Sequence, residues 1–343
     1  MRRALEGLRE EVVEGVIRPL DGWEEYVGGS WFAVPFLWAE SFFYRRLLEA
    51  VGYFGEGAWR GIDPFGPFKR AELRGEVVAE ELAALDEVGE MAPHARDRAL
   101  LDGALWGNRA DLGFRISTEV STEASGGAGE PGEARLLVDE SDAFWRHLEK
   151  GAKPAAVHLL ADNAGRELIP DLVLLDHLLT TGRAATAVLH VKPYPYFVSD
   201  ATTADVVDCL RRIGEAPGRA ARIGARLWDA LATGQLTVRA HPFGCAPLPY
   251  AEMPDDLRVE LGTATVTIVK GDLNYRRLVG DRHWPATTPF ADLTAHFPGP
   301  LLALRTLKCD VAVGLEPSAV AALDASGADW RTSGTHAVVQ FRP

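Results

Sequence analysis

The chain has 343 residues and a formal net charge of −13 at pH 7, with 47% hydrophobic and 25% charged residues. This composition is ordinary for a globular protein, and the length predicts about two structural units at ~150 residues per domain. The acidic surface repels phosphate backbones at long range, which argues against a nucleic-acid partner. No run approaches the ~20 apolar residues of a membrane span, so we expect no membrane association.

The start of the chain and its cysteines indicate the compartment. Residues 1–6 are basic and then charged, without the apolar core of a secretory signal. Cys209, Cys245 and Cys309 lack the paired spacing of a disulfide framework or a zinc ribbon. Reduced thiols are therefore predicted. These features together predict a cytoplasmic protein.

Helical periodicity dominates the first third of the chain. Apolar residues recur at helical spacing within 5–16, 36–48 and 68–85. The polar, glycine-rich stretch 117–133 predicts a flexible surface loop, because no strand pattern precedes it as a nucleotide-binding loop would require. We therefore predict a helical N-terminal subdomain over residues 1–115 and a flexible loop over 116–135.

Short apolar runs alternate with helical segments over residues 136–343, which we predict to be an α/β domain. Such alternation is typical of a parallel sheet covered by helices on both faces. Helices are expected over 168–179 and from residue 204. The apolar runs that predict strands lie at 155–160, 185–191, 263–269, 301–304, 311–315 and 336–341.

Polar residues follow four of these predicted strands. In an open parallel sheet, ligands bind beyond the carboxyl ends of the strands. If the four strands are neighbours, their ends face one crevice. The residues in question, strand by strand, are Asp162 and Asn163; Asp200; Lys270, Asp272 and Asn274; and Arg305 and Lys308.

Asp162, Asn163 and Asp200 offer two carboxylates and one amide oxygen, a hard ligand set that suits Mg²⁺ or Mn²⁺. Such an ion polarises a phosphoryl oxygen and activates water for attack. Arg305 and Lys308 would hold the non-bridging phosphoryl oxygens. Taken alone, an Asp-Asn pair is more often a turn or a helix cap than a metal site. The prediction of phosphoryl chemistry therefore depends on the strand ends converging.

Several short motifs run along nearly the whole chain in a fixed order. The most distinctive are 106–112 (WGNRADL), 162–167 (DNAGRE), 197–200 (FVSD), 270–276 (KGDLNYR) and 305–308 (RTLK). In this order they resemble the metal-dependent damage-control phosphatases, in the branch that includes the eukaryotic acidic residue methyltransferase proteins. One departure is Gly113, where that family usually has serine.

The resemblance implies a three-layer α/β/α sandwich with a parallel-rich sheet and a helical N-terminal subdomain. It implies hydrolysis of small phosphorylated metabolites, such as sugar phosphates, with Mn²⁺ or Mg²⁺ and with Co²⁺ or Ni²⁺ as alternatives. The metal would be held by Asp162, Asn163 and Asp200, which with Lys308 form the implied catalytic set. The implied substrate contacts are Asn108, Glu167, Asp272, Leu273, Asn274, Tyr275, Arg276, Arg305 and Lys308.

Two other functions stay open at this point. A carboxyl methyltransferase using S-adenosylmethionine would normally carry a glycine-rich turn where this chain has Asp162-Asn163-Ala164-Gly165. A catalytically inactive binding protein is disfavoured by the complete set of metal-type residues. For a phosphatase, the missing Asp-x-Asp pattern of haloacid-dehalogenase enzymes favours attack by water over a carboxylate nucleophile. We expect a monomer or a homodimer acting on a small phosphorylated metabolite.

Overall fold

The computed structural model describes residues 1–20, 22–107, 135–151 and 154–343. Asn108, almost all of the predicted loop 116–135 and the predicted boundary at residue 115 lie outside the described residues. Among the described helices, none is long and apolar enough to cross a membrane. The strands are β1 (Arg135–Asp139), β2 (Ala156–Leu160), β3 (Thr186–Val191), β4 (Leu236–Ala240), β5 (Val266–Lys270), β6 (Leu301–Thr306) and β7 (His336–Arg342).

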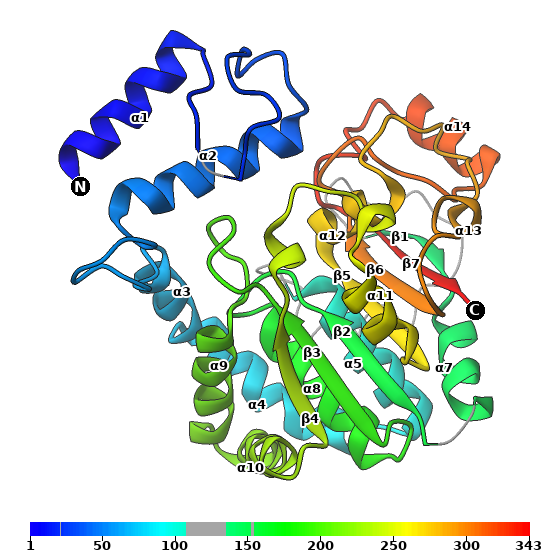
Figure 1. Cartoon of the computed structure of the whole chain (residues 1–343). Helices are drawn as coiled ribbons and strands as arrows, with labels where there is room; N and C mark the ends of the chain where they lie inside the picture. The colour runs from blue at the N-terminus through cyan, green and yellow to red at the C-terminus, as the bar shows by residue number, and fades with distance from the viewer. Residues whose placement is uncertain (21, 108–134, 152–153) are drawn as a thin grey trace.

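These strands form one sheet in the order β1-β7-β6-β5-β2-β3-β4 (Figure 1). The five strands from β6 to β4 run parallel, whereas β7 is antiparallel to β6 and β1 is parallel to β7. The inner parallel strands are mostly apolar, as expected of strands that helices cover on both faces. The four strands whose ends carry the predicted polar residues are β2, β3, β5 and β6, and they are neighbours. The predicted fold class is confirmed.

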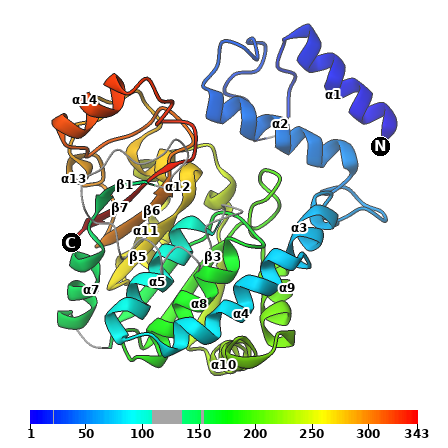
Figure 2. The ribbon, with the colours of Figure 1, turned by 180° about the vertical axis from the view of Figure 1, so that it is seen from behind.

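Helices cover both faces of the sheet (Figures 1 and 2). Side chains alternate along β2, so that Val157 and Leu159 pack in one core and Leu160 in the other. The first layer comprises α4 (Glu76–Glu90), α5 (Pro93–Trp106), α7 (Ser141–Lys150), α8 (Leu168–Thr180), α9 (Thr203–Glu215) and α10 (Gly218–Thr233). The second comprises η3 (Tyr250–Glu252), α11 (Asp255–Gly262), α12 (Gly271–Val279), α13 (Phe290–Leu293) and α14 (Pro317–Ala325), with η2 (Pro242–Cys245) beside them.

Of the first three helices, two lie outside the sheet layers and the third packs Leu73 into the first core. The three are α1 (Arg2–Glu14), α2 (Phe36–Val51) and α3 (Gly66–Leu73). An aromatic cluster that includes Trp38 and Phe42 holds α2 to the segment after α1. The hydroxyls of Ser41 and Tyr196 lie 2.5 Å apart, so α2 sits over the loop that follows β3. By contrast, α4 and α5 pack into the same core as the sheet, so only part of the predicted helical subdomain is separate from it.

Two predicted elements differ in the structure. The helical pattern over 68–85 is divided between α3 and α4, because the backbone is extended at Gly75, a residue with low helix propensity. The strand predicted at 311–315 is wrong. There Val311 O accepts a hydrogen bond from the Arg305 side chain, and Val313 O accepts one from Gln340 Nε2 at 2.8 Å. These carbonyls are satisfied by side chains, so they need no neighbouring strand.

Candidate metal and phosphate site

The candidate site lies between β2 and β5, where the strand order of the sheet reverses. From β2 the chain continues through α8 to β3 on one side, and from β5 through α12 to β6 on the other. Such a switch point leaves a crevice at the carboxyl ends of the strands. Gly271 begins α12 with φ +83°, and a Cβ there would overlap the Asp162 carboxylate. Only glycine lets α12 approach the end of β2 this closely.

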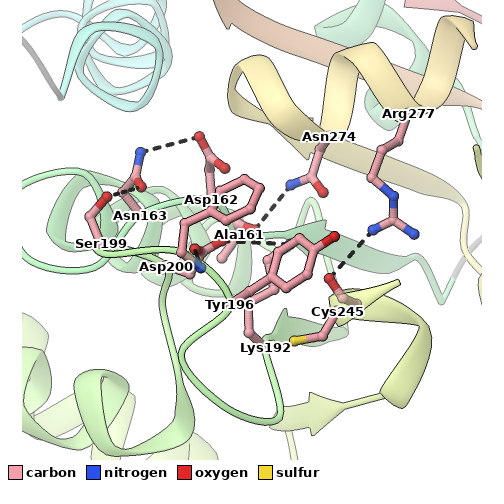
Figure 3. A network of polar contacts seen from close by, with 12 residues as sticks. Ala161, Asp162, Asn163, Lys192, Tyr196, Ser199, Asp200, Cys245, Asn274 and Arg277 are labelled. Atoms are coloured by element: carbon pink, nitrogen blue, oxygen red, sulfur yellow. Dashed lines mark hydrogen bonds and ion pairs between the residues drawn. The ribbon is translucent and has the colours of Figure 1, made fainter. Parts of the chain in front are cut away.

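The predicted metal ligands Asp162, Asn163 and Asp200 come together at this edge (Figure 3). Asn163 and Asp200 form an isolated antiparallel bridge. On either side of it, Ala201 N donates to Asp162 O at 2.9 Å and Ala164 N donates to Ser199 O at 2.7 Å. The loop after β3 is thereby fixed against the loop after β2. The backbone segments that carry Asp162, Asn163 and Asp200 are therefore adjacent, and metal binding by their side chains stays a prediction.

Excess negative charge is buried at this edge. Burial raises the pKa of Asp162 well above its ordinary value, and repulsion from Glu167 and Asp200 adds to the effect. Burial also raises the pKa of Asp200, although Lys192, with Nζ 4.0 Å from Oδ1, opposes it. A divalent cation would relieve this repulsion. No three His, Cys, Asp or Glu side chains form a metal-binding group within the described ranges. The Asn163 amide stays the predicted third ligand.

The Asn163 side chain directs its amide N–H groups toward two carboxylates, where a cation would otherwise supply positive charge. Its Nδ2 donates to Asp162 Oδ2 at 3.2 Å and to Glu167 Oε2 at 2.9 Å, while Ser199 Oγ donates to its Oδ1 at 2.6 Å. Amide hydrogens thus face two carboxylates. Turning the amide over would point its oxygen toward Asp162, and the residues present then fit an oxygen-ligated ion.

Lys270 at the end of β5 holds two acids at the start of α8. Its Nζ lies 3.4 Å from Glu167 Oε1 and 3.0 Å from Asp171 Oδ1. Burial alone would lower the pKa of Lys270, but Asp171 and Glu167 outweigh burial and raise it. One ammonium balances only one carboxylate, and burial raises the pKa of Asp171 to about 7. Lys270 therefore ties β5 to α8 beneath the metal-type residues.

Three of the predicted substrate residues on α12 point into the protein. Asn274 Nδ2 donates to Ala161 O at 3.1 Å and to Lys270 O at 2.9 Å, which joins α12 to the ends of β2 and β5. Tyr275 OH donates to Gln340 Oε1 at 2.7 Å, and Leu273 is buried. Their side chains shape and support the site, and any direct substrate contact by them stays a prediction.

The predicted phosphate-binding cations differ in how exposed they are and in whether a carboxylate already pairs with them. Arg305 is 1% exposed, and its Nε donates to Asp272 Oδ1 at 2.8 Å. Arg276 donates to both carboxylate oxygens of Asp281, at 2.7 and 3.0 Å. Lys308 is exposed, and its charge lowers the pKa of Asp162. Lys308 therefore differs from Arg305 and Arg276 in being an exposed cation whose charge acts on Asp162.

The chain is similar to known proteins over most of its length. The model of the damage-control phosphatase ARMT1-like domain matches residues 4–323. The chain belongs to this family. Relatives named damage-control phosphatase ARMT1 from Danio rerio and Mus musculus are 33% and 34% identical, over 91% of this chain and 74% and 75% of theirs. A solved DUF89 family protein from Pyrococcus horikoshii shares the fold, with a TM-score of 0.52 at 16% identity over 99% of this chain and 88% of that one.

Membership of the ARMT1-like family confirms the resemblance drawn from the motifs. It supports a metal-dependent damage-control phosphatase and does not favour the methyltransferase alternative. The family generally depends on a divalent metal, and its phosphatase activity indicates small phosphorylated metabolites as substrates.

Sequence reasoning missed three charged residues at this edge. Lys192 directly follows β3 and is 4% exposed, so the strand-end rule that selected Asp200 would also have found it. Glu40 on α2 has a pKa raised by burial and by the charges of Asp200 and Asp272, with Arg276 opposing. Lys69 on α3 is buried against the loop after β3. The last two lie on helices, where periodicity gives no sign of a remote partner.

Lys69 is expected to position Asp200. Its Nζ donates to the backbone oxygen of Asp200 at 2.7 Å and lies 3.0 Å from carboxylate oxygens of both Asp63 and Asp205. Lys69→Met should lower kcat/KM about 10–100-fold and weaken the apparent affinity for the activating metal, because supporting contacts of this kind have such effects. Phosphatase activity is measured as a function of metal concentration, at a temperature below the melting temperature of each variant. Arg70→Met, at an exposed neighbour, is the control, and equal metal titrations of the two variants would contradict the assignment.

Proposed function

We propose that the protein hydrolyses phosphomonoesters of small metabolites, sugar phosphates among them, with a divalent ion held by Asp162, Asn163 and Asp200. The observation that supports this most is the pair of buried carboxylates, Asp162 and Asp200, whose pKa values are raised chiefly by burial even though Lys192 opposes the rise at both. Mn²⁺ or Mg²⁺ suits these oxygen ligands. When bound, such an ion polarises the phosphoryl group and makes water a better nucleophile.

The surrounding residues would bind and orient the phosphoryl group. The first turns of α8 and α12 both start at this edge, and neither has a side chain that caps it. The N–H groups at the start of a helix commonly bind anions, although Ile169 N in the first turn of α8 already donates to Gly165 O at 3.1 Å. Lys308 adds an exposed positive charge. Asp272, held by Arg305 and facing Lys308 N at 3.4 Å, would keep that loop in place.

Metal removal tests the proposed function directly. Protein stripped with EDTA should not hydrolyse p-nitrophenyl phosphate or a panel of sugar phosphates, and Mn²⁺ or Mg²⁺ should restore the activity. Co²⁺ and Ni²⁺ are the comparison ions. Phosphate release is the measurement. Undiminished hydrolysis in EDTA would exclude the proposal, and metal-free transfer of a labelled methyl group from S-adenosylmethionine would support the methyltransferase instead.

A further inference from the structure

A second pocket lies at the other end of α8 from the metal site. It has a volume of about 240 Å³ and lies among the last turns of α4 and α8 and the first turns of α5 and α10. Figure 2 shows α4, α8 and α10 side by side at this end of the molecule. Since α8 has 13 residues, the pocket is ~20 Å from the metal-type residues. We call it the basal pocket, and its charged lining residues are Arg96, Asp176, Arg219 and Arg226.

Positive charge in the basal pocket exceeds negative charge, although the whole chain is acidic. Arg226 donates to both oxygens of Asp176, at 2.8 and 2.6 Å, so these two charges cancel. Among the described residues, Arg96 donates to backbone oxygens at the end of α4 and to no side chain, with Gly89 O at 2.6 Å and Met91 O at 2.9 Å. In the part of the chain that the structure describes, the Arg219 guanidinium has no hydrogen-bond or ion-pair partner. Two guanidinium charges in the pocket therefore lack a counter-anion.

A glycine inside α4 makes room for Arg219. A Cβ at Gly89 would overlap the Arg219 guanidinium, which lies directly beside Gly89. Glycine is among the least favourable residues inside a helix, and Gly89 lies in α4 with an ordinary backbone conformation. Its use at this point is explained by the close approach of Arg219. The position of that guanidinium is thus built into the packing of α4 and α10.

We propose that the basal pocket binds a small anion carrying a phosphate group, through Arg96 and Arg219. Planar guanidinium groups match the oxygens of phosphate and form strong charge-assisted hydrogen bonds with them. The pocket is smaller than the ~300–1,000 Å³ of a drug-sized site, which suits phosphate or a small phosphate ester. This site is separate from the catalytic edge and requires no metal.

Calorimetric titration of the full chain with inorganic phosphate in EDTA tests the proposal. Gly89→Ala, which displaces the Arg219 guanidinium, and Arg219→Ala should each weaken binding about tenfold or more, since each removes a charge-assisted contact. Arg222→Ala removes an exposed charge from the same helix outside the pocket and should bind as the wild type does. Because alanine favours helix, Gly89→Ala should melt no lower than the wild type, so a loss of binding would not reflect unfolding.

Lys308→Ala distinguishes binding in the basal pocket from binding at the catalytic edge. This variant should leave phosphate binding in EDTA unchanged. Repeating the titration with glycerol phosphate shows whether a free phosphate or an ester binds more tightly. The proposal is overturned if the wild type binds neither anion in EDTA. It is also overturned if Gly89→Ala and Arg219→Ala bind as the wild type does, or if only Lys308→Ala loses binding. Phosphatase activity with metal is assayed separately, so failure here leaves the proposed function intact.

Discussion

Asp162→Asn is expected to lower kcat/KM for p-nitrophenyl phosphate about 10³-fold without lowering the melting temperature of the chelated protein. The activity falls because the amide is a poor substitute for a carboxylate ligand and the charge that holds the ion is lost. The fold should not suffer, because the native carboxylate is buried beside Glu167 and Asp200 and its pKa is raised. A neutral amide removes that repulsion. Such a trade between stability and activity is common at active sites.

Steady-state kinetics with saturating Mn²⁺ and thermal melting in EDTA measure the two effects. The control is Asp229→Asn, at an exposed aspartate on α10, which should change neither quantity. If Asp162→Asn retained wild-type kcat/KM, the assignment of this residue to the metal would be wrong. A marked fall in melting temperature would instead mean that the Asp162 charge is compensated within the protein, contrary to the electrostatics described above.

Lys270→Met should destabilise the fold by about 3–5 kcal/mol at pH 7, because it leaves buried acids without their cation. Lys270 is 1% exposed and lies within ion-pairing distance of Glu167 and Asp171. Equilibrium unfolding in urea measures the change. In Lys270→Met/Asp171→Leu, one of the buried acids is also gone, so this double variant should recover much of the loss. Equal stabilities of the single and double variants would show that the pairing with Asp171 contributes nothing.

The pH dependence of unfolding follows from Asp171, one of the two acids that lie beside Lys270. The pKa of Asp171 is about 7 in the fold and lies near 3.8 when the group is exposed. The folded state therefore binds more protons between these values, and the contribution of Asp171 to stability decreases as pH rises from about 4 to 7. Without Lys270 the penalty for ionising the acids grows, so the difference between Lys270→Met and wild type should shrink toward pH 4. A difference in the free energy of unfolding between Lys270→Met and wild type that stays constant from about pH 4 to 7 would contradict this explanation.

The sequence predicts those structural features that a local pattern of residues specifies, and it does not predict those that lack such a pattern. The strands β2, β3, β5 and β6 are continuous apolar runs with polar residues at their ends, and the rule for open parallel sheets places Asp162 and Asp200 together. The edge strands β1 and β4 were missed because their short, mixed sequences give little periodic signal. The apolar run at 311–315 was misassigned because it packs in the core while Arg305 and Gln340 satisfy its carbonyls.

Side-chain partners are harder to predict than elements. The motif that contains Leu273, Asn274 and Tyr275 was linked to substrate as a unit, yet a helix turns each successive side chain by about 100°. In the structure, Asn274 therefore binds the ends of β2 and β5 while Tyr275 reaches β7. Arg305 looked like a free phosphate ligand, but Asp272 engages it. Such pairings join residues that are distant in sequence, and no local pattern specifies them.

The pairing of β2 with β5 has a consequence for how the protein matures. Val157 pairs with Val266, and Gly271 must then settle against Asp162. The loops after β2 and β3, which carry the proposed ligands, leave the ribosome long before β5 is synthesised, and such non-local pairing forms slowly. A nascent chain that ends before β5 would have both aspartates but no finished crevice around them. Tight capture of a divalent ion would then mark the completion of folding rather than start it.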